Sequence, residues 1–272
     1  MTQPYVHGYD PRENERLDDQ AGTLVDLLHG DTQYPDGSTV LEAGCGVGSQ
    51  TVTLASQSPG AQFTSVDISA SSVAQAEARV RAAGLTNVEF LHADLFELPF
   101  APASFDHVFV CFVLEHLAQP VAALQAVMRL VRAGGTVTVI EGDHGSTYFH
   151  PDSSAARAAV QCQVELQRRA GGDANIGRRL YPIMADAGLE DVRVSPRTVY
   201  ADGSRPAWAE GFTRRTFTAM IEGVRRPAVE AGLMTAEAFD AGIRDLYRTA
   251  ESDGTFSYTF FKGVGFKGLG RR

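Results

Sequence analysis

A glycine-rich turn after a short apolar strand is the part of this sequence best suited to binding a charged ligand. The stretch Val40–Gly48 reads V-L-E-A-G-C-G-V-G, and a helix can start near Gln50. Bare backbone amides at such a helix start let a ligand approach closely. The spacing is G-x-G-x-G, and Ser49 stands where a dinucleotide fingerprint has its third glycine. Because the Glu42 carboxylate before the turn would repel a pyrophosphate, we expect the turn to bind something positively charged.

Two further carboxylates follow the next two predicted strands. Asp67 ends the second strand, where an acidic side chain can accept hydrogen bonds from two ribose hydroxyls. Ile68 beside it could cover one face of an adenine ring. Asp94, in H-A-D-L-F, suits the exocyclic amine of adenine, and the amide of Leu95 suits a ring nitrogen. Both aspartates are also common turn formers, so their combination with the glycine turn is what indicates a nucleoside site.

Candidate acid–base groups follow the fifth predicted strand, in E-G-D-H-G-S-T-Y-F-H. We expect this segment to be a loop at the carboxyl edge of the sheet, where open α/β sheets bind ligands. His144 could be a base oriented by Asp143 or Glu141, in a cleft where such groups are enriched. The N-terminal residues could close over the site as a lid. The candidates for catalysis or acceptor binding in these two segments are Glu141, Asp143, His144, Tyr148, Tyr5, His7 and Tyr9.

The stretch E-A-G-C-G-V-G resembles motif I of the class I S-adenosylmethionine-dependent methyltransferases, and the resemblance extends to about Glu141. It implies S-adenosylmethionine as cofactor and S-adenosylhomocysteine as product. Gln20, on the first helix, could reach the methionine carboxylate, although solvated polar residues are the default there. Cys111 and Phe112, at the end of the fourth strand, would face the transferred methyl group. The implied cofactor residues are Glu42, Gly44, Gly46, Gly48, Gln20, Asp67, Ile68, Asp94, Leu95 and Cys111.

The elements that must position these residues alternate between helix and strand. Apolar spacing predicts a helix over 11–29, and β-prone runs predict strands that alternate with helices up to Glu141. Such alternation indicates right-handed βαβ units and a parallel sheet. We therefore expect an α/β, Rossmann-like fold with a seven-stranded, mostly parallel sheet. The predicted strands are 39–43, 63–67, 87–92, 105–112, 136–141, 192–200 and 255–261, and the later helices are 49–58, one from Ala70, 120–131, 152–170 and 175–187.

The C-terminal part departs from the family pattern. The family ends its sheet in an antiparallel hairpin, whereas here about fifty residues with two amphipathic stretches separate the last two strands. We expect a helical insertion over 203–252 that is a cap or an oligomer surface, although amphipathic helices that merely pack on the sheet are the alternative. The remaining expected parts are an N-terminal lid and helix, 1–30, and a methyltransferase core, 31–202 plus 253–270.

Composition narrows the class of protein. With 272 residues, 44% of them hydrophobic, the chain can bury a sizeable core, and a net charge of −9 disfavours nonspecific nucleic-acid binding. Three cysteines are too few for a disulfide framework or a four-ligand zinc site. Glu141 and Asp143 alone are thin for magnesium, so we expect no metal. We see no signal peptide and no membrane span, and expect a cytoplasmic protein that forms a homo-oligomer.

The most specific hypothesis concerns the acceptor. The H-G-Y near the start, the E-R-L-x-x-Q helix and E-G-D-H-G-S look like bacterial natural-product enzymes that methylate indole C3 of tryptophan-derived compounds and give pyrroloindolines. In that case His144, Glu141 or Tyr5 would take up the indole N–H proton, and Trp208 or Phe112 would stack on the ring. The alternatives are an O- or N-methyltransferase of another aromatic, quinone or lipid metabolite, and a cofactor-binding protein or cyclase that transfers no methyl group.

Overall fold

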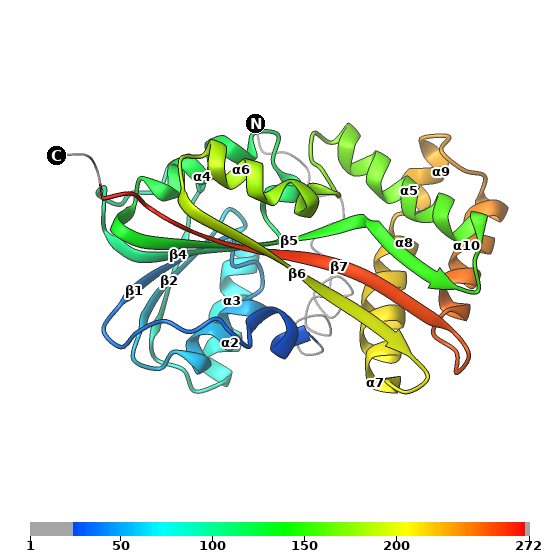
Figure 1. The fold of residues 1–272 in the computed structure, drawn as a ribbon, viewed down its shortest axis with the longest axis horizontal. Coiled ribbons are helices and arrows are strands. Elements are labelled where there is room, and N and C mark those ends of the chain that lie inside the picture. Colours follow the sequence, from blue (N-terminus) through cyan, green and yellow to red (C-terminus); the bar gives the residue numbers. More distant parts are fainter. Residues whose placement is uncertain (1–23, 270–272) are drawn as a thin grey trace. The chain divides into compact units, whose positions relative to one another are not determined.

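A seven-stranded sheet organises the chain in a computed structural model that describes residues 24–269 (Figure 1). The strand order is β3-β2-β1-β4-β5-β7-β6. The strands are β1 (Thr39–Ala43), β2 (Gln62–Asp67), β3 (Val88–His92), β4 (Phe105–Cys111), β5 (Val131–His150), β6 (Glu190–Asp202) and β7 (Thr255–Phe266). The helices among them are α2 (Ser49–Gln57), α3 (Ala70–Ala82), η1 (Leu114–His116), α4 (Pro120–Met128), α5 (Ser154–Arg169), η2 (Ile176–Arg179) and α6 (Leu180–Asp186).

The first five strands are parallel neighbours, as the alternation of strands and helices predicted. β1 pairs with β2 on one side and with β4 on the other, β2 pairs with β3, and β4 pairs with β5. Parallel pairing brings the carboxyl ends of these strands to one edge of the sheet. Ser69 is the N-cap of α3, since its Oγ accepts a hydrogen bond from the amide of Ser72 at 3.2 Å.

The last strand runs antiparallel to both of its neighbours. Gly134 N donates to Lys267 O at 2.8 Å and Lys267 N donates to Gly135 O at 2.9 Å, while Thr259 N donates to Ser146 Oγ at 2.9 Å. Residue numbers therefore increase along β5 where those of the paired residues in β7 decrease. Figure 1 shows β7 running in the direction opposite to β5 and β6. The predicted fold class is confirmed, with a helical insertion between β6 and β7. The insertion holds α7 (Pro206–Trp208), the π-helical η3 (Ala209–Thr218), α8 (Ala219–Gly223), α9 (Arg225–Glu230) and α10 (Ala236–Arg248).

Several predicted boundaries are wrong; β7, for example, continues to Phe266 and does not end at Phe261. The segment 142–150, predicted as a loop, is the second half of β5, which continues to His150. Its pairing with β7 includes the hydrogen bond from Thr259 N to Ser146 Oγ, and the strand bends locally where Ser146 Oγ donates to Asp143 O, three residues earlier, at 2.6 Å. The helix predicted over 120–131 ends at Met128, and β5 begins at Val131, five residues before its predicted start.

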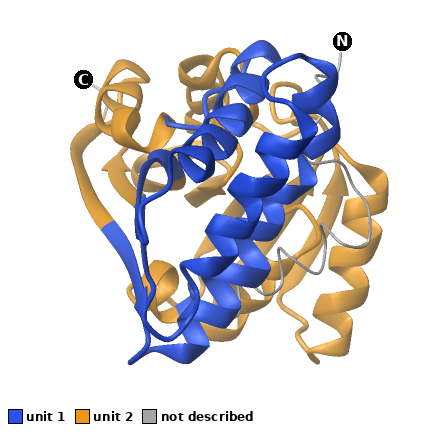
Figure 2. Cartoon of the chain, turned by 90° about the vertical axis from the view of Figure 1, so that its right-hand side faces the viewer, with its two compact units in different colours: residues 1–25, 142–175, 197–260 blue, residues 26–141, 176–196, 261–272 orange. Residues whose placement is uncertain are grey.

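The chain divides into two compact units, which Figure 2 colours separately. The first unit comprises 1–25, 142–175 and 197–260, and the second comprises 26–141, 176–196 and 261–272. β5 passes from the second unit into the first after Glu141. In the second unit, residues of β1, β4 and β5 pack with α4 and α6 in one apolar core. The division into lid, core and cap that the sequence suggested stays a prediction.

The core of the first unit is largely aromatic. It gathers rings from η3 and β7, with the centroids of Phe217 and Phe256 4.9 Å apart and those of Tyr258 and Phe260 4.7 Å apart. The apolar face of α10 is buried there too, and Ser153 Oγ, before α5, donates to Asp245 Oδ2 at 2.5 Å. The apolar stripes of the insertion are therefore covered within the unit that contains them.

Candidate active site

The glycine turn joins β1 to α2 in the second unit, and its glycines meet different surroundings. All three have positive φ angles, 85° at Gly44, 51° at Gly46 and 82° at Gly48. A Cβ on Gly44 would lie 2.3 Å from Val113 Cγ2, and one on Gly48 would lie 2.8 Å from the Cα of Ala76 in α3. A Cβ on Gly46 would meet nothing within 4 Å. The outer glycines are thus required by packing, whereas the middle one faces open space that a ligand can enter.

Glu42 is held below the turn by hydroxyl groups. The hydroxyls of Thr51 and Ser65 donate to its Oε2 at 2.7 Å and 2.6 Å. Burial of the carboxyl group raises its pKa to about 7, and the two hydroxyls offset part of that shift. Glu42 therefore fixes α2 and β2 to the turn and is only partly charged at neutral pH, which weakens the electrostatic argument that its charge alone selects a cation.

Asp67 connects the end of β2 to the same turn. Gly46 N donates to its Oδ2 at 2.8 Å, and Ser69 N donates to Oδ1 at 2.9 Å. Burial raises the pKa of the carboxyl group, and these amides pull it back down. A carboxylate has about four acceptor positions, so both oxygens can still accept further hydrogen bonds.

The residues after β2 and β3 form an apolar and acidic neighbourhood at the carboxyl edge. Ile68 and Phe96 expose 45% and 46% of their surface, which is unusual for large apolar side chains. Asp94 Oδ1 accepts from Phe96 N at 2.9 Å, which shapes the loop after β3. Leu95 is half-buried and packs against the core of the second unit. His92 Nε2 lies 3.0 Å from Ile68 O, so the two loops contact each other.

The end of β4 contains a strained residue and a buried acid. Cys111 is buried, and burial raises the pKa of its thiol well above the ordinary value, so the thiol is protonated. Phe112 follows with a left-handed φ of 57°, and its amide donates to Ile140 O at 2.9 Å. Glu141 Oε1 accepts from Val113 N at 3.1 Å and from Leu114 N at 2.7 Å. These two hydrogen bonds hold the turn that leads into η1. Burial of the Glu141 carboxyl group raises its pKa well above its usual range.

The other predicted acceptor and acid–base residues that the structure describes belong to the first unit. Asp143 is buried, and its Oδ1 accepts from Gly145 N at 3.1 Å. His144 is also buried, and its Nδ1 contacts Ala174 O at 3.0 Å, a partner that was not predicted. Tyr148 is 74% exposed on β5. Trp208, in α7, is half-buried, and the guanidinium of Arg205 lies over its ring, 5.3 Å from the centroid.

Four predicted site residues, Tyr5, His7, Tyr9 and Gln20, lie outside the described residues. Within 24–269, no group of three or more His, Cys, Asp or Glu side chains is placed to hold a metal ion. Helices long and apolar enough to cross a membrane are likewise not found in that range.

The second unit thus brings together the candidates on β1, β2, β3 and β4, while Asp143, His144, Tyr148 and Trp208 lie in the first unit. The sequence did not suggest two residues that shape these surroundings, Ala174 and Tyr258 beside His144. They lie far along the chain from the residue they contact, so no local sequence pattern could predict the contact.

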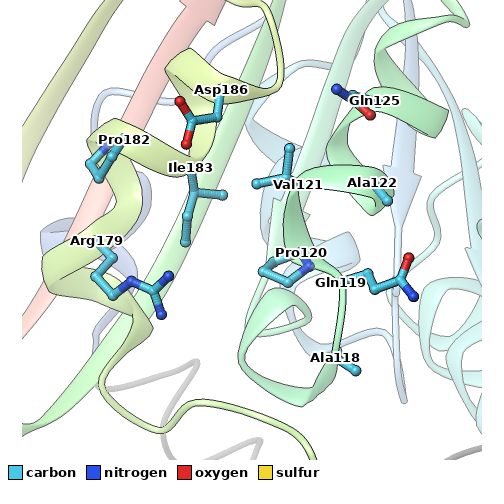
Figure 3. A pocket seen from close by; sticks show the side chains of 10 residues that line it. All are labelled: Ala118, Gln119, Pro120, Val121, Ala122, Gln125, Arg179, Pro182, Ile183 and Asp186. Atoms are coloured by element: carbon cyan, nitrogen blue, oxygen red, sulfur yellow. The ribbon is translucent and has the colours of Figure 1, made fainter.

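A cavity of about 520 Å³ lies between α4 and α6 in the second unit (Figure 3). Apolar side chains such as Val121 and Ile183 line its middle, and Arg179 and Asp186 lie on its α6 side. Among the described residues, no predicted site residue lines this cavity.

Comparisons with known proteins agree with the geometry. A family model described as a methyltransferase domain matches residues 41–139. The chain is 33% identical over 175 residues to the demethylmenaquinone methyltransferase of Bacillus cytotoxicus, covering 60% of this chain and 74% of that protein. It is 27% identical over 226 residues to the 27-O-demethylrifamycin SV methyltransferase of Amycolatopsis mediterranei, covering 82% and 77%.

Two further similarities are weaker, one because it covers only part of the relative and one because its sequence identity is low. A transposon-borne protein of Streptomyces fradiae is 34% identical over 190 residues, but the match spans only 54% of that protein and 69% of this chain. Among solved structures, the [4+2]-cyclase SpnF superposes with a TM-score of 0.56 at 18% identity, covering 93% of this chain and 82% of that one. A likeness at this identity shows a shared fold only.

Proposed function

The chain belongs to the class I S-adenosylmethionine-dependent methyltransferases, and from this premise we propose that it methylates a small aromatic acceptor in natural-product metabolism. As a member of this family it uses S-adenosylmethionine as cofactor. Two of its relatives have names that state methylation of demethylmenaquinone and of 27-O-demethylrifamycin SV, which supports a small-molecule acceptor. Our specific proposal is methylation of indole C3 in a tryptophan-derived compound.

The described residues of the second unit fit this cofactor. The open space at Gly46 would admit its amino-acid portion, and the Asp67 oxygens would accept from its ribose hydroxyls. The exposed apolar surfaces of Ile68 and Phe96 would cover the adenine ring, and Asp94 would accept from its amine. When bound, the cofactor supplies a methyl group already made labile by a sulfonium. The single observation that carries the proposal is the open space beside Gly46, in a turn whose shape is held by the hydrogen bond from Gly46 N to the Asp67 carboxylate.

In the methyl transfer, the residues of this chain would orient the acceptor and remove one proton from it. Methylation of a neutral indole at C3 forms the C3–CH₃ bond and breaks the S–CH₃ bond, whose electron pair stays on sulfur. One proton must then leave the acceptor, and a positioned base accelerates its loss. We assign that proton to His144 rather than to Glu141, because Glu141 Oε1 already accepts two backbone hydrogen bonds. Phe112 or Trp208 would stack on the ring, and Tyr5 and His7 stay candidates for a lid.

An acceptor panel tests the proposal. The purified chain is incubated with S-adenosylmethionine carrying a ¹³C-methyl group and with a tryptophan-containing cyclic dipeptide, an indole already methylated at C3, a hydroquinone or a phenol. We expect label only in the first acceptor, with an NMR signal of a methyl group on a saturated ring carbon. Label on oxygen or nitrogen would overturn indole C3 methylation in favour of an O- or N-methyltransferase.

The cyclase alternative, which the sequence left open, is separated by a control. A cyclase that merely retains the cofactor would convert its substrate while S-adenosylmethionine is replaced by S-adenosylhomocysteine. We expect turnover of the cyclic dipeptide to stop completely under that replacement.

A further inference from the structure

We infer that Ala174 and Tyr258 hold His144 in the tautomer that carries hydrogen on Nδ1, so that Nε2 is the atom that accepts the proton. The inference rests on the proposed function for its catalytic consequence, but the tautomer can be measured without any acceptor. All the residues involved belong to the first unit.

The Ala174 carbonyl fixes the hydrogen on Nδ1. Its oxygen accepts from the backbone amide of His144 at 3.0 Å and also lies 3.0 Å from Nδ1 of the same residue. A carbonyl oxygen has no hydrogen to donate, so a contact of this length requires hydrogen on Nδ1. In a neutral imidazole the other nitrogen, Nε2, then has the basic lone pair.

Tyr258, on β7, completes the arrangement from a second direction. Its hydroxyl lies 3.2 Å from Nδ1, and its ring meets the imidazole edge-on, with centroids 5.7 Å apart and planes at 81°. Because Nδ1 carries the hydrogen, its N–H donates to both the Ala174 carbonyl and the Tyr258 phenol oxygen, as a bifurcated hydrogen bond. Phe217 lies against the imidazole as well, at 5.9 Å between centroids, so the ring has little rotational freedom.

Gly142 makes room for the tyrosine hydroxyl. A Cβ on Gly142 would lie 2.3 Å from that oxygen, so any other residue at this position of β5 would displace it. The G-D-H order in this strand therefore has a steric reason: the glycine admits Tyr258, and the histidine two positions later meets it.

The two Nδ1 contacts described above come from uncharged groups, a backbone carbonyl and a phenol. An aspartate at that position, as in a hydrolase triad, stabilises the imidazolium strongly and makes the histidine a stronger base. A carbonyl and a phenol orient the ring with less stabilisation of its charged form. Tyr258 is then a positioning residue that acts through His144.

Nitrogen NMR of protein labelled with ¹⁵N-histidine tests the tautomer directly. The signals of His144 are identified by their loss in a His144→Gln variant, among those of the seven histidines. We expect the wild-type pattern of a protonated Nδ1 and an unprotonated Nε2 at a pH where the ring is neutral. The reverse pattern, or a mixture of the two tautomers, would overturn the inference even if the protein methylates indoles. The expected pattern in a protein that does not methylate indoles would leave the tautomer standing and refute only the acceptor.

Kinetics test the positioning role. His144→Gln should lower kcat about 100-fold, as expected for loss of a general base. Tyr258→Phe should lower kcat about fivefold with little change in KM, which corresponds to the loss of one neutral hydrogen bond. Tyr200→Phe, which alters an exposed tyrosine of β6 in the same unit, should leave both constants unchanged. An unchanged kcat in Tyr258→Phe, or a loss confined to KM, would refute the positioning role.

A second variant, in β5, displaces the Tyr258 hydroxyl without changing the tyrosine itself. Gly142→Ala should displace the Tyr258 oxygen and weaken its contact with Nδ1, giving the mixed nitrogen pattern and the smaller kcat of Tyr258→Phe. If Gly142→Ala leaves both unchanged, the hydroxyl has no part in holding the ring.

Discussion

Asp67 has two partners in the structure and is assigned a third in our account. Its oxygens accept the amides of Gly46 and Ser69, which sets the shape of the turn, and we propose that they also accept the ribose hydroxyls. Asp67→Ala should lower affinity for S-adenosylhomocysteine at least about 100-fold, because two hydrogen bonds to a charged group are lost. Calorimetric titration measures this. Asp26→Ala, which removes an exposed carboxylate of the same unit, should bind like the wild type, and unchanged affinity in Asp67→Ala would show that the ribose assignment is wrong.

The glycines of the turn should respond differently to alanine. Gly44→Ala forces a Cβ into Val113 at a positive φ, so we expect a loss of several kcal/mol of folding free energy. Gly46→Ala meets open space and should cost only about 1 kcal/mol, from its positive φ, yet it should lower cofactor affinity because the Cβ occupies the ligand's approach. Denaturant unfolding and calorimetry of both variants check the contrast. Equal effects on stability, or normal cofactor binding in Gly46→Ala, would contradict this assignment of the turn.

Glu42 should make stability depend on pH. Its pKa rises from an ordinary 4.5 to about 7 on folding, so the folded state disfavours the charged form. The resulting stability is fully present below pH 4.5 and is lost as pH rises toward 7, by roughly 3 kcal/mol. Relative to Glu42→Gln, which keeps an oxygen for Thr51 and Ser65, the wild type should lose stability over this range and stay level above it.

Unfolding free energies measured between pH 4.5 and 8 for the wild type and Glu42→Gln test this dependence. Glu89→Gln, on the exposed side of β3, is the matched control and should follow the wild type at every pH. A constant difference between wild type and Glu42→Gln would mean that the carboxyl group titrates normally in the folded protein.

At the scale of elements, the sequence predicted what is local and missed what is tertiary. The strand–turn–helix of Val40–Gln57 could be recognised because its signals are neighbours in sequence: apolar strand residues, glycines and a helix start. β5 was cut short because G-D-H-G-S reads as a loop, and its pairing with β7 depends on residues more than a hundred positions away, such as Thr259. The contacts of His144 with Ala174 and Tyr258 escaped prediction for the same reason.

β7 contains a buried ammonium group that we expect to stabilise the second unit. Lys262 is buried, and its Nζ donates to Leu28 O at 3.2 Å, to Asp31 Oδ1 at 2.6 Å and to Thr32 Oγ1 at 2.5 Å. Lys262→Met should lower the free energy of unfolding by about 2 kcal/mol, because the buried carbonyl and hydroxyl lose their partner. Arg81→Met, which breaks an exposed ion pair with Glu77, should change it by less than about 0.5 kcal/mol. Similar losses in the two variants would show that the buried ammonium contributes nothing beyond a surface charge.

At the scale of the whole molecule, the proposed roles follow the two units. The described cofactor candidates lie in the second unit together with Glu141, whereas His144, to which we assign the proton, lies in the first. We also propose a homo-oligomer, as the sequence suggested. The buried apolar faces of α10 and η3 are not available to form its interface, so another surface would have to supply it.

The ratio of products tests the central claim most directly. In one reaction with S-adenosylmethionine and a tryptophan-containing cyclic dipeptide, S-adenosylhomocysteine and the C3-methylated pyrroloindoline are both quantified by mass spectrometry. We predict that they accumulate in equal amounts in the wild type and that both fall together in Asp67→Ala. Conversion of the dipeptide without S-adenosylhomocysteine, or cofactor that binds and is never consumed with any acceptor of the panel, would contradict the account.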